Sequence, residues 1–493
     1  MADVCLLLEG TFPYVSGGVS TWIYDLIRQM DDISFAICYL GPHRLAHKKM
    51  HYEIPDNVTD FQEIYIFDYE IAKKARRPQI SQKDMKVIED FLLHMRKNDP
   101  AYFDSFARLL NGKSIDLYDL AFSFDSWKII LDIYEAEGEE PSFIDYFWTW
   151  RFVYLPLFSL LKSNLPEAKL YHSVSTGYAG VLGALAKLKY QRPFMLTEHG
   201  IYTRERKIEI SQAEWIYSET ANEIKVTEAN DFFKEWWMGL FSFFSRLAYN
   251  RADEIISLFE GNRKIQIEEG APVSRTRIIP NGVDVGLFRD IKKTPPDGIF
   301  RIGFMGRVVP IKDVKTFIRA CKIIFMQMKN IEIYIMGPTD EDEEYYKECV
   351  LLAQREGLEQ VIKFCGKVDI YEYYPKLDVI VLTSISEGQP IVVLEAGICG
   401  IPVVATNVGA CEELLYGATP DDRLLGKSGE ITLPYDPQAT ADAVMRMLKN
   451  SEAHARMAAA GKKRVNLYYQ MDDLIANYRL LYAKYMQEAK WQG

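Results

Sequence analysis

Short apolar segments alternate with amphipathic helical segments along most of this 493-residue chain. In the second half, FRIGFMG (300–306), IEIYIMG (331–337) and DVIVLTS (378–384) have the pattern of strands. Between the first two, apolar residues from Val314 to Phe325 recur at the spacing of one helix face. Strands this apolar are buried on both faces, so the alternation predicts a parallel sheet covered by helices.

The first half of the chain begins in the same way. VCLLLEG (4–10) precedes a helix that starts at about Val19, and AKLYHSVS (168–175) and PFMLTEHG (193–200) follow later. These segments predict a second parallel α/β unit. A helical, charged and aromatic-rich insertion interrupts it at about 65–165.

A polar segment at 284–298, which contains Pro295–Pro296, marks the expected boundary between the two units. We therefore predict an N-terminal domain at 1–285 and a C-terminal domain at 286–469. An amphipathic helix at 470–493 is expected to pack back on the first domain. The fold class is α/β, with two Rossmann-like, doubly wound parallel sheets facing a central cleft at the carboxyl ends of their strands.

Composition excludes several classes of protein. The net charge of −11 argues against a nucleic-acid partner, which selects a basic face. The N-terminus lacks the basic region of a signal peptide, and no apolar run reaches the roughly eighteen residues of a membrane span. Seven cysteines without a CxxC pair are typical of reduced thiols, so we expect a cytoplasmic protein.

The segment SEGQPIVVLEA places two carboxylates in an apolar run. Pro390 suits the first turn of a helix, where its missing N–H is not needed, and the N–H groups of Ile391 and Val392 would then be free for an anion. Glu387 is expected in the loop before this helix, at the cleft. Glu395 falls inside the helix and needs a partner, because a bare buried carboxylate is costly. Ribose hydroxyls would serve.

Two loops and one strand end supply further candidates. Arg307 and Lys312 follow the first strand of the second domain, where two cations suit a diphosphate, although loop cations are often only solvated. Gly17 and Gly18 open a helix and let the backbone approach a phosphate or sugar closely, or simply form a tight turn. His199 ends a strand at the expected cleft edge, where a structural role is the alternative to catalysis.

Three other features favour ordinary structural roles. His43, His47 and His51 have helical spacing but lie in a loop-like stretch, so we do not expect a metal site. The DED motif at 340–342 opens an acidic helix start, where carboxylates favour the helix dipole. The aromatic stretch at 231–250 lacks a basic face and predicts a core helix rather than a membrane-surface helix.

Four sequence blocks resemble, in order, those of the retaining glycosyltransferases of family 4, which have the GT-B fold. They are IIPNGVD (278–284), GFMGRVVPIKD (303–313), SEGQPIVVLEA (386–396) and PVVATNVGACEEL (402–414). The first domain resembles a narrower group. EGTFPYVSGGVSTWIYDLI, TEHGIYTRERKIEI and the insertion are similar to the PelF-type glycosyltransferases of the Pel exopolysaccharide system.

The resemblance implies how the leaving nucleotide would be held. Arg307, Lys312 and the N–H groups of Ile391 and Val392 would bind the donor's diphosphate, and Glu395 would bind the ribose hydroxyls. The uracil ring would lie near Lys367–Val368. The family works without a metal, so no cofactor is expected besides the UDP-sugar donor.

For the transferred sugar, the resemblance implies that Glu387 faces it and that His199 lies near its anomeric carbon. Gly17 and Gly18 would form the loop over the donor phosphate and the acceptor side. One position departs from the family pattern. Gln389, before Pro390, replaces the usual aromatic or small residue, so the donor-sugar preference does not carry over.

The implied activity is metal-independent transfer, with retention, of a hexose or N-acetylhexosamine from UDP-glucose or a UDP-N-acetylhexosamine to a growing exopolysaccharide. The resemblance also implies recruitment to an inner-membrane synthase complex through partner proteins. A UDP-sugar 2-epimerase and a non-catalytic UDP-sugar-binding scaffold are the alternatives. An NAD enzyme is disfavoured, because neither half has GxGxxG after its first strand.

Overall fold

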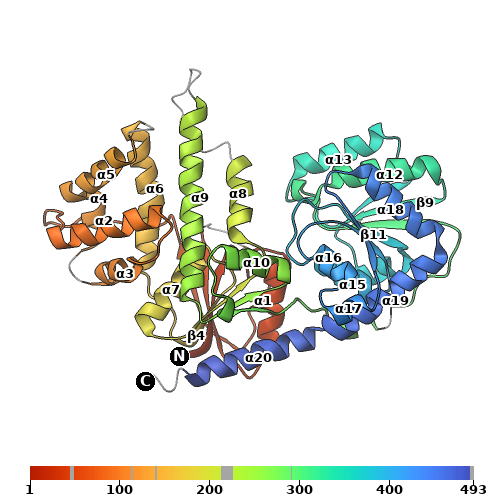
Figure 1. The fold of residues 1–493 in the computed structure, drawn as a ribbon, viewed down its shortest axis with the longest axis horizontal. Helices are drawn as coiled ribbons and strands as arrows, with labels where there is room; N and C mark the ends of the chain where they lie inside the picture. Colours follow the sequence, from red (N-terminus) through yellow and green to blue (C-terminus); the bar gives the residue numbers. More distant parts are fainter. Residues whose placement is uncertain (45–48, 113–114, 139–141, 213–225, 290, 489–493) are drawn as a thin grey trace. The chain divides into compact units, whose positions relative to one another are not determined.

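The computed structural model describes residues 1–44, 49–112, 115–138, 142–212, 226–289 and 291–488. The chain divides into two compact units, each an α/β structure (Figure 1). The first comprises 1–257, 263–277 and the chain from 479 onward, and the second comprises 258–262 and 278–478.

The first unit is built on a seven-stranded sheet with the order β3-β2-β1-β4-β5-β6-β7. The pairs from β3 through β6 are parallel. The central run Val4–Leu8 is completely buried, as expected for a strand covered on both faces. The strands are β1 (Ala2–Glu9), β2 (Phe35–Gly41), β3 (Val58–Tyr65), β4 (Ala168–Ser173), β5 (Phe194–Glu198), β6 (Glu254–Ser257) and β7 (Thr276–Ile278).

The second unit is built on a six-stranded sheet with the order β10-β9-β8-β11-β12-β13, and all of its pairs are parallel. Each sheet therefore starts in the middle, grows to one side and then crosses to the other, which is the Rossmann order. The strands are β8 (Phe300–Met305), β9 (Ile331–Met336), β10 (Ile362–Gly366), β11 (Val379–Leu382), β12 (Val403–Thr406) and β13 (Gly429–Thr432).

Helices of the first unit connect its strands and form the insertion. They are α1 (Gly18–Arg28), α2 (Gln82–Arg96), α3 (Phe103–Asn111), α4 (Leu117–Phe122), α5 (Phe124–Ala136), α6 (Phe143–Leu161), α7 (Tyr178–Tyr190), α8 (Tyr202–Gln212), α9 (Val226–Arg251) and α10 (Glu260–Glu268), whose first residues belong to the second unit.

Helices of the second unit alternate with its strands in the same way. They are α11 (Val285–Phe288), α12 (Val314–Gln327), α13 (Glu343–Arg355), α14 (Ile370–Tyr373), α15 (Ile391–Ile398), α16 (Cys411–Tyr416), α17 (Pro420–Arg423), α18 (Pro437–Lys449) and α19 (Ser451–Tyr468). The last helix, α20 (Met471–Glu488), contributes to the second unit through Tyr478 and to the first from Arg479. In the first unit, the Tyr482 hydroxyl lies 2.7 Å from Nδ1 of His172.

The predicted doubly wound α/β architecture is confirmed, and the helix expected from Val314 is α12. The structure also confirms the core assignment of the aromatic stretch 231–250, which forms most of α9. Its buried side chains include Phe233, Trp236, Trp237, Leu240, Phe241, Phe243, Phe244 and Leu247. Among the described residues, no helix is both long enough and apolar enough to cross a membrane.

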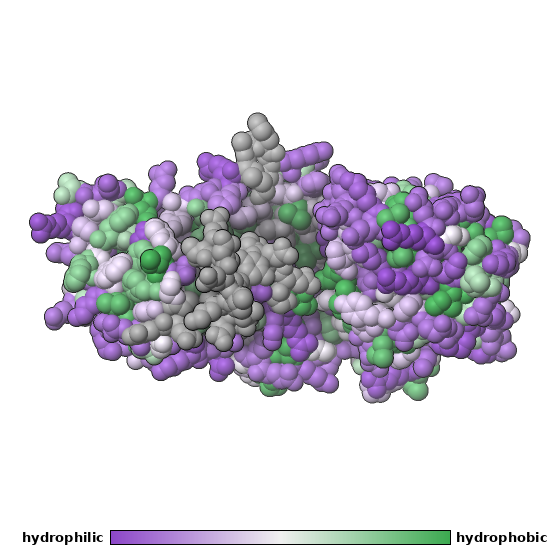
Figure 2. Space-filling model, turned by 90° about the horizontal axis from the view of Figure 1, so that it is seen from above, coloured by the Kyte–Doolittle hydropathy of each residue, from purple (hydrophilic) through white to green (hydrophobic). Residues whose placement is uncertain are grey.

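The insertion is a layer of helices, α2 to α6, beside α9 (Figure 1). Aromatic rings fill its interior, and Phe91 stacks on Phe106 with ring centroids 4.2 Å apart. Figure 2 shows a mainly hydrophilic surface on which hydrophobic residues form separate patches, several of them over these helices.

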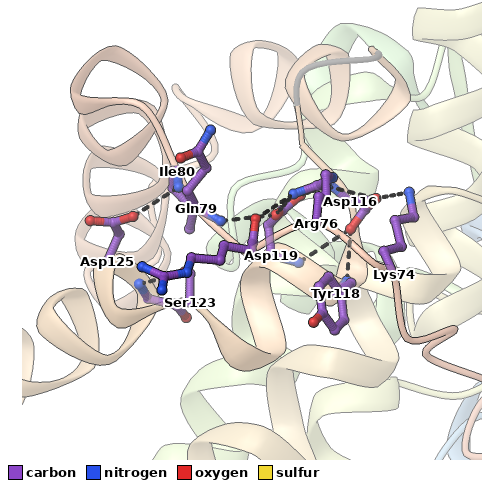
Figure 3. Close-up of polar contacts among 11 residues, drawn as sticks. Lys74, Arg76, Gln79, Ile80, Asp116, Tyr118, Asp119, Ser123 and Asp125 are labelled. Carbon is purple, nitrogen blue, oxygen red and sulfur yellow. Dashed lines mark hydrogen bonds and ion pairs between the residues drawn. The ribbon is translucent and has the colours of Figure 1, made fainter.

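A network of polar contacts holds the segment before α2 against α4 (Figure 3). The Asp119 side chain is completely buried and receives both arms of the Arg76 guanidinium, at 2.5 and 2.6 Å. Its two oxygens also accept the backbone N–H groups of Gln79 and Asp116, each at 3.1 Å. At the edge of the network, the exposed Lys74 pairs with Asp116. Asp119 thus compensates its burial with four donors.

We predict that Asp119→Asn destabilises the insertion, because the buried amide of the variant cannot accept from all four donors that the carboxylate satisfies. Leaving a buried hydrogen-bonding group unsatisfied costs about 1–3 kcal/mol in the free energy of unfolding. Lys74→Ala is the matched control, and loss of its exposed ion pair costs less than about 1 kcal/mol. Urea titrations followed by circular dichroism measure both. Equal losses for the two variants would contradict the role assigned to Asp119.

Candidate functional site

In the second sheet the strand order reverses between β8 and β11, and the loops after these strands carry a partly buried ion pair. Lys312 Nζ lies 2.5 Å from Glu387 Oε1, and the two side chains are 18% and 10% exposed. Ser384 Oγ donates to the same carboxylate oxygen at 2.6 Å. Within the described residues, Glu387 Oε2 has no hydrogen-bond partner and Lys312 retains two N–H donors.

A glycine after β12 supports the loop that carries Glu387. Gly409 has φ +54, and a Cβ there would lie 2.3 Å from the carbonyl oxygens of Glu387 and Gly388. The next residue, Ala410, donates its N–H to the Gly388 carbonyl at 2.9 Å. This close approach fixes the loop and requires a residue without a side chain.

Helix α15 begins at Ile391, and Pro390 is its N-cap residue rather than its first residue. This corrects the predicted helix start by one position. The Val393 N–H already bonds to the Pro390 carbonyl, so the N–H groups of Ile391 and Val392 are those that the first turn leaves for a ligand.

Glu395 lies one turn into α15, and its partner in the protein is a tyrosine. Tyr374 donates its hydroxyl to Glu395 Oε2 at 2.6 Å. Burial raises the pKa of Glu395 and outweighs this hydrogen bond, which lowers it. The carboxylate therefore has one anchored oxygen and one that can accept further hydroxyls.

The other candidates of the second unit have separate environments. Arg307 is exposed and pairs with Glu341 at 2.7 Å. Gln389 is buried, and its Oε1 accepts the Asn281 N–H at 2.6 Å, so this side chain holds the loop at 280–282. Val368 is partly buried against the apolar core.

The remaining features of the predicted set have structural partners. In the DED motif, Asp342 caps α13 by accepting the Tyr345 N–H, which agrees with the expected acidic helix start. His43 lies 2.8 Å from Asp68, and His47 lies outside the described residues.

In the first sheet the order reverses between β1 and β4, and a cavity of about 640 Å³ lies at the carboxyl ends of these strands. His199 lines this cavity. Gly17 caps α1 and Gly18 is its first residue, with open space where a Cβ would lie on either glycine. The neighbouring Val19 lines the cavity.

His199 is neutral at physiological pH, because burial lowers its pKa to about 4. Its ring meets Trp22 edge to face, with centroids 4.7 Å apart. Its Nε2 is enclosed and has no hydrogen-bond partner among the described residues. A neutral imidazole in this position can donate to or accept from a ligand hydroxyl.

Sequence reasoning missed two carboxylates at the same edge. Glu9 ends β1, lines the cavity and accepts the Tyr202 hydroxyl at 2.8 Å. Glu198, the last residue of β5, is buried and accepts from four donors: Tyr249, Gln266, Thr176 and the Tyr202 N–H. The signal available in the sequence was that each ends an apolar run with a charge.

Two family profiles match the chain. Residues 2–274 match the family described as "Domain of unknown function (DUF3492)", which covers more than half of the chain. The chain belongs to this family. Residues 289–464 match the family described as "Glycosyl transferases group 1", so the second unit of this DUF3492 protein is a group 1 glycosyltransferase domain.

Curated relatives and solved structures agree with this placement. A D-inositol 3-phosphate glycosyltransferase of Catenulispora acidiphila is 30% identical over 40% of this chain and 47% of its own length. The capsular polysaccharide biosynthesis glycosyltransferase CapM of Staphylococcus aureus is 22% identical over 68% of this chain and 84% of its own length. The chain spans about half the length of the first curated relatives that it matches.

Among solved structures, Anabaena HepE in complex with UDP and glucose aligns with a TM-score of 0.58 and 16% identity, over 98% of this chain and 100% of that one. Sucrose-phosphate synthase from Thermosynechococcus elongatus has the same TM-score and 15% identity, over 98% of each chain. These matches confirm the predicted GT-B fold class of two Rossmann-like domains.

The Glu198 carboxyl predicts a pH dependence of stability in the DUF3492 protein. Burial raises its pKa from 4.5 to about 7, so the folded state holds a proton that the unfolded state has released. Stability therefore falls as pH rises from about 4.5 to about 7, by about 3 kcal/mol in all. Glu198→Gln, which mimics the protonated form, removes this contribution.

Melting temperatures of the wild type and of Glu198→Gln between pH 4.5 and 8 measure the effect. Glu167→Gln changes an exposed carboxyl of the same unit and is the control. We expect the melting temperature of Glu198→Gln, relative to that of the wild type, to rise with pH. The relative melting temperature of Glu167→Gln should not change with pH. A constant difference would show that Glu198 stays ionised throughout.

Proposed function

We propose that this chain is a retaining, metal-independent glycosyltransferase that moves a hexose or N-acetylhexosamine from a UDP-sugar to a growing exopolysaccharide, in a Pel-like system. The observation that carries the proposal is the Lys312–Glu387 pair at the strand-order reversal of a group 1 glycosyltransferase domain. HepE, which shares the fold, was solved with UDP and glucose, and CapM acts in capsular polysaccharide biosynthesis.

On this proposal, positive charge in the second unit binds the donor's diphosphate. Lys312 contributes its two remaining N–H donors, and the N–H groups of Ile391 and Val392 contribute the positive end of α15. Arg307 joins them by exchanging its exposed partner Glu341 for phosphate oxygens. These groups supply the charge neutralisation that a metal supplies in other transferases.

The neutral parts of the donor are bound by hydrogen-bond acceptors and apolar surface. The open oxygen of Glu395 accepts the ribose hydroxyls, and Val368 packs near the uracil ring. Glu387 accepts a hydroxyl of the transferred sugar through Oε2. Buried Gln389 and Pro390 hold the start of α15 in place for this contact.

The proposed reaction breaks the bond between the sugar's anomeric carbon and the phosphate oxygen, whose electron pair leaves with UDP. Lys312, Arg307 and the α15 amides stabilise the developing negative charge. The acceptor hydroxyl attacks the same face of the sugar and gives its proton to the leaving phosphate. For the first unit, we assign neutral His199 to the sugar near its anomeric carbon, and Gly17 and Gly18 to the donor phosphate and acceptor side.

We further propose a cytoplasmic location, with recruitment to an inner-membrane exopolysaccharide synthase complex through partner proteins. All seven cysteines are free, which suits a reducing compartment. Donors of the UDP-sugar class and a polysaccharide acceptor are the small-molecule and glycan partners that the proposal requires.

Lys312→Ala should weaken UDP binding, because it removes charge-assisted hydrogen bonds to phosphate. Such bonds contribute about 1.5–3 kcal/mol, which corresponds to a factor of about 10 to 100 in Kd. The control is Lys315→Ala. Lys315 is a cation three residues further along the chain, and it pairs with Glu348. Calorimetric titration of UDP into both variants checks this, and equal affinities would remove Lys312 from the site.

The transfer itself is tested with UDP-glucose, UDP-N-acetylglucosamine and UDP-N-acetylgalactosamine, each with and without EDTA. We expect a new glycosidic bond with the α configuration of the donor, at a rate that EDTA leaves unchanged. Nuclear magnetic resonance of the product gives the anomeric configuration. An inverted product, loss of activity in EDTA, or a C2 epimer formed without acceptor would each overturn part of the proposal.

A further inference from the structure

The cavity of the first unit contains buried polar atoms that the protein does not satisfy. Thr11 Oγ1, His199 Nε2 and Arg206 Nε are enclosed and have no hydrogen-bond partner within the described part of the chain, and all three residues line the cavity. Nearly all buried polar atoms in folded proteins are paired. Three unpaired atoms around one cavity therefore indicate a ligand that carries hydroxyl groups.

The cavity also offers a carboxylate in a fixed orientation. Glu9 accepts the Tyr202 hydroxyl at 2.8 Å through Oε1 and the Ala179 N–H at 3.2 Å through Oε2. Oε2 also accepts the Ser175 hydroxyl at 3.4 Å, so Oε1 is the oxygen that keeps a further lone pair for a ligand donor. A ligand hydroxyl can therefore donate to Glu9 and accept from Arg206 or His199.

Aromatic residues form part of the wall in one continuous cluster. Phe241 contacts Tyr202 edge to face at 5.6 Å and Trp237 in a stacked arrangement at 5.8 Å, measured between centroids. Trp237 in turn contacts Phe152 at 6.0 Å, and Phe152 stacks on Phe67 at 5.1 Å. Aromatic side chains beside fixed hydrogen-bonding groups match a pyranose ring, which is apolar on its faces and polar at its edge.

Phe152 belongs both to the cavity and to an exposed row on α6. Ile144, Trp148 and Phe152 are 69%, 62% and 50% exposed. Their spacing of four residues places them on one helix face, about 6 Å apart along the axis. We call these three residues the α6 row. Phe147, which contacts Trp148 at 5.5 Å, packs on Trp127 behind it.

We propose that the cavity and the α6 row form one elongated binding site for a carbohydrate chain. The terminal sugar occupies the cavity, and the following sugar units lie on Phe152 and Trp148. The inference rests on the proposed function, because it assigns the bound chain as the acceptor. It gives the helical insertion a role in selecting acceptors by length.

A lipid surface fits these residues less well. The α5 and α6 helices carry four acidic residues, Asp125, Asp132, Glu135 and Asp145, against Lys128 and Arg151. Membrane-surface helices place basic residues beside their aromatic face instead. An acyl chain would also leave the polar atoms of Thr11, His199 and Arg206 unsatisfied.

The test uses cello-, chito- and malto-oligosaccharides of two to six units, titrated into the full chain by calorimetry. In the wild type we expect the affinity for at least one series to rise with length. Trp148→Ala should remove that gain, on the order of tenfold for the longest chains, and leave the disaccharide affinity unchanged. Thr11→Val, which preserves shape, should instead weaken every length.

Tyr435→Ala removes an exposed aromatic ring of the second unit and is the matched control. The unchanged disaccharide affinity of Trp148→Ala shows that the first unit of the variant is folded, and UDP binding reports separately on the second unit. If the wild type did not bind UDP, the proposed donor would be wrong, but the measurement of glycan binding would still test this inference.

Three results would overturn the inference. They are no binding of any series, a length dependence that Trp148→Ala leaves intact, and Trp148-dependent binding to phosphatidylglycerol vesicles without glycan binding. The last result would assign the α6 row to a membrane surface.

Discussion

In each sheet the chain builds outward from its first strand to one edge and then returns to build the other side. The loops after β1 and β4, and those after β8 and β11, consequently turn away from each other. This geometry creates a crevice at the carboxyl ends of the strands, and no particular side chain is needed to form it. The Lys312–Glu387 pair lies at one such position and the cavity with His199 at the other, so topology determines where chemistry can be placed.

The crevice of the second unit contains carboxylates that are anchored through one oxygen and open at the other. Glu387 is held by Lys312 and Ser384 through a single oxygen, and Glu395 is held by Tyr374. An anchored carboxylate loses little conformational entropy when a ligand arrives, because its rotamer is already fixed. Glu198 differs, since four protein donors already satisfy it, and it stiffens the edge beside His199.

The local pattern of apolar residues was sufficient to predict much of the fold and part of the candidate site. The run from Val314 to Phe325 repeats every three to four residues, and α12 follows it closely. The Lys312–Glu387 bond could not be read from the sequence, because 75 residues separate its ends and periodicity describes only near neighbours. The cavity is still harder to predict from the sequence, because its wall combines residues from Glu9 to Phe241.

The ligands proposed for the two units differ chemically, and the side chains of the two sites differ accordingly. A diphosphate carries charge, so its proposed site relies on Lys312 and on the first turn of α15, which attract anions. A neutral glycan chain needs no excess of one charge in its site. The first-unit cavity accordingly combines aromatic side chains and His199, whose low pKa keeps it uncharged, with the hydrogen-bonding groups of Glu9 and Arg206. Because electrostatic attraction is screened by salt and contact with aromatic faces is not, donor affinity should depend on ionic strength far more than glycan affinity does.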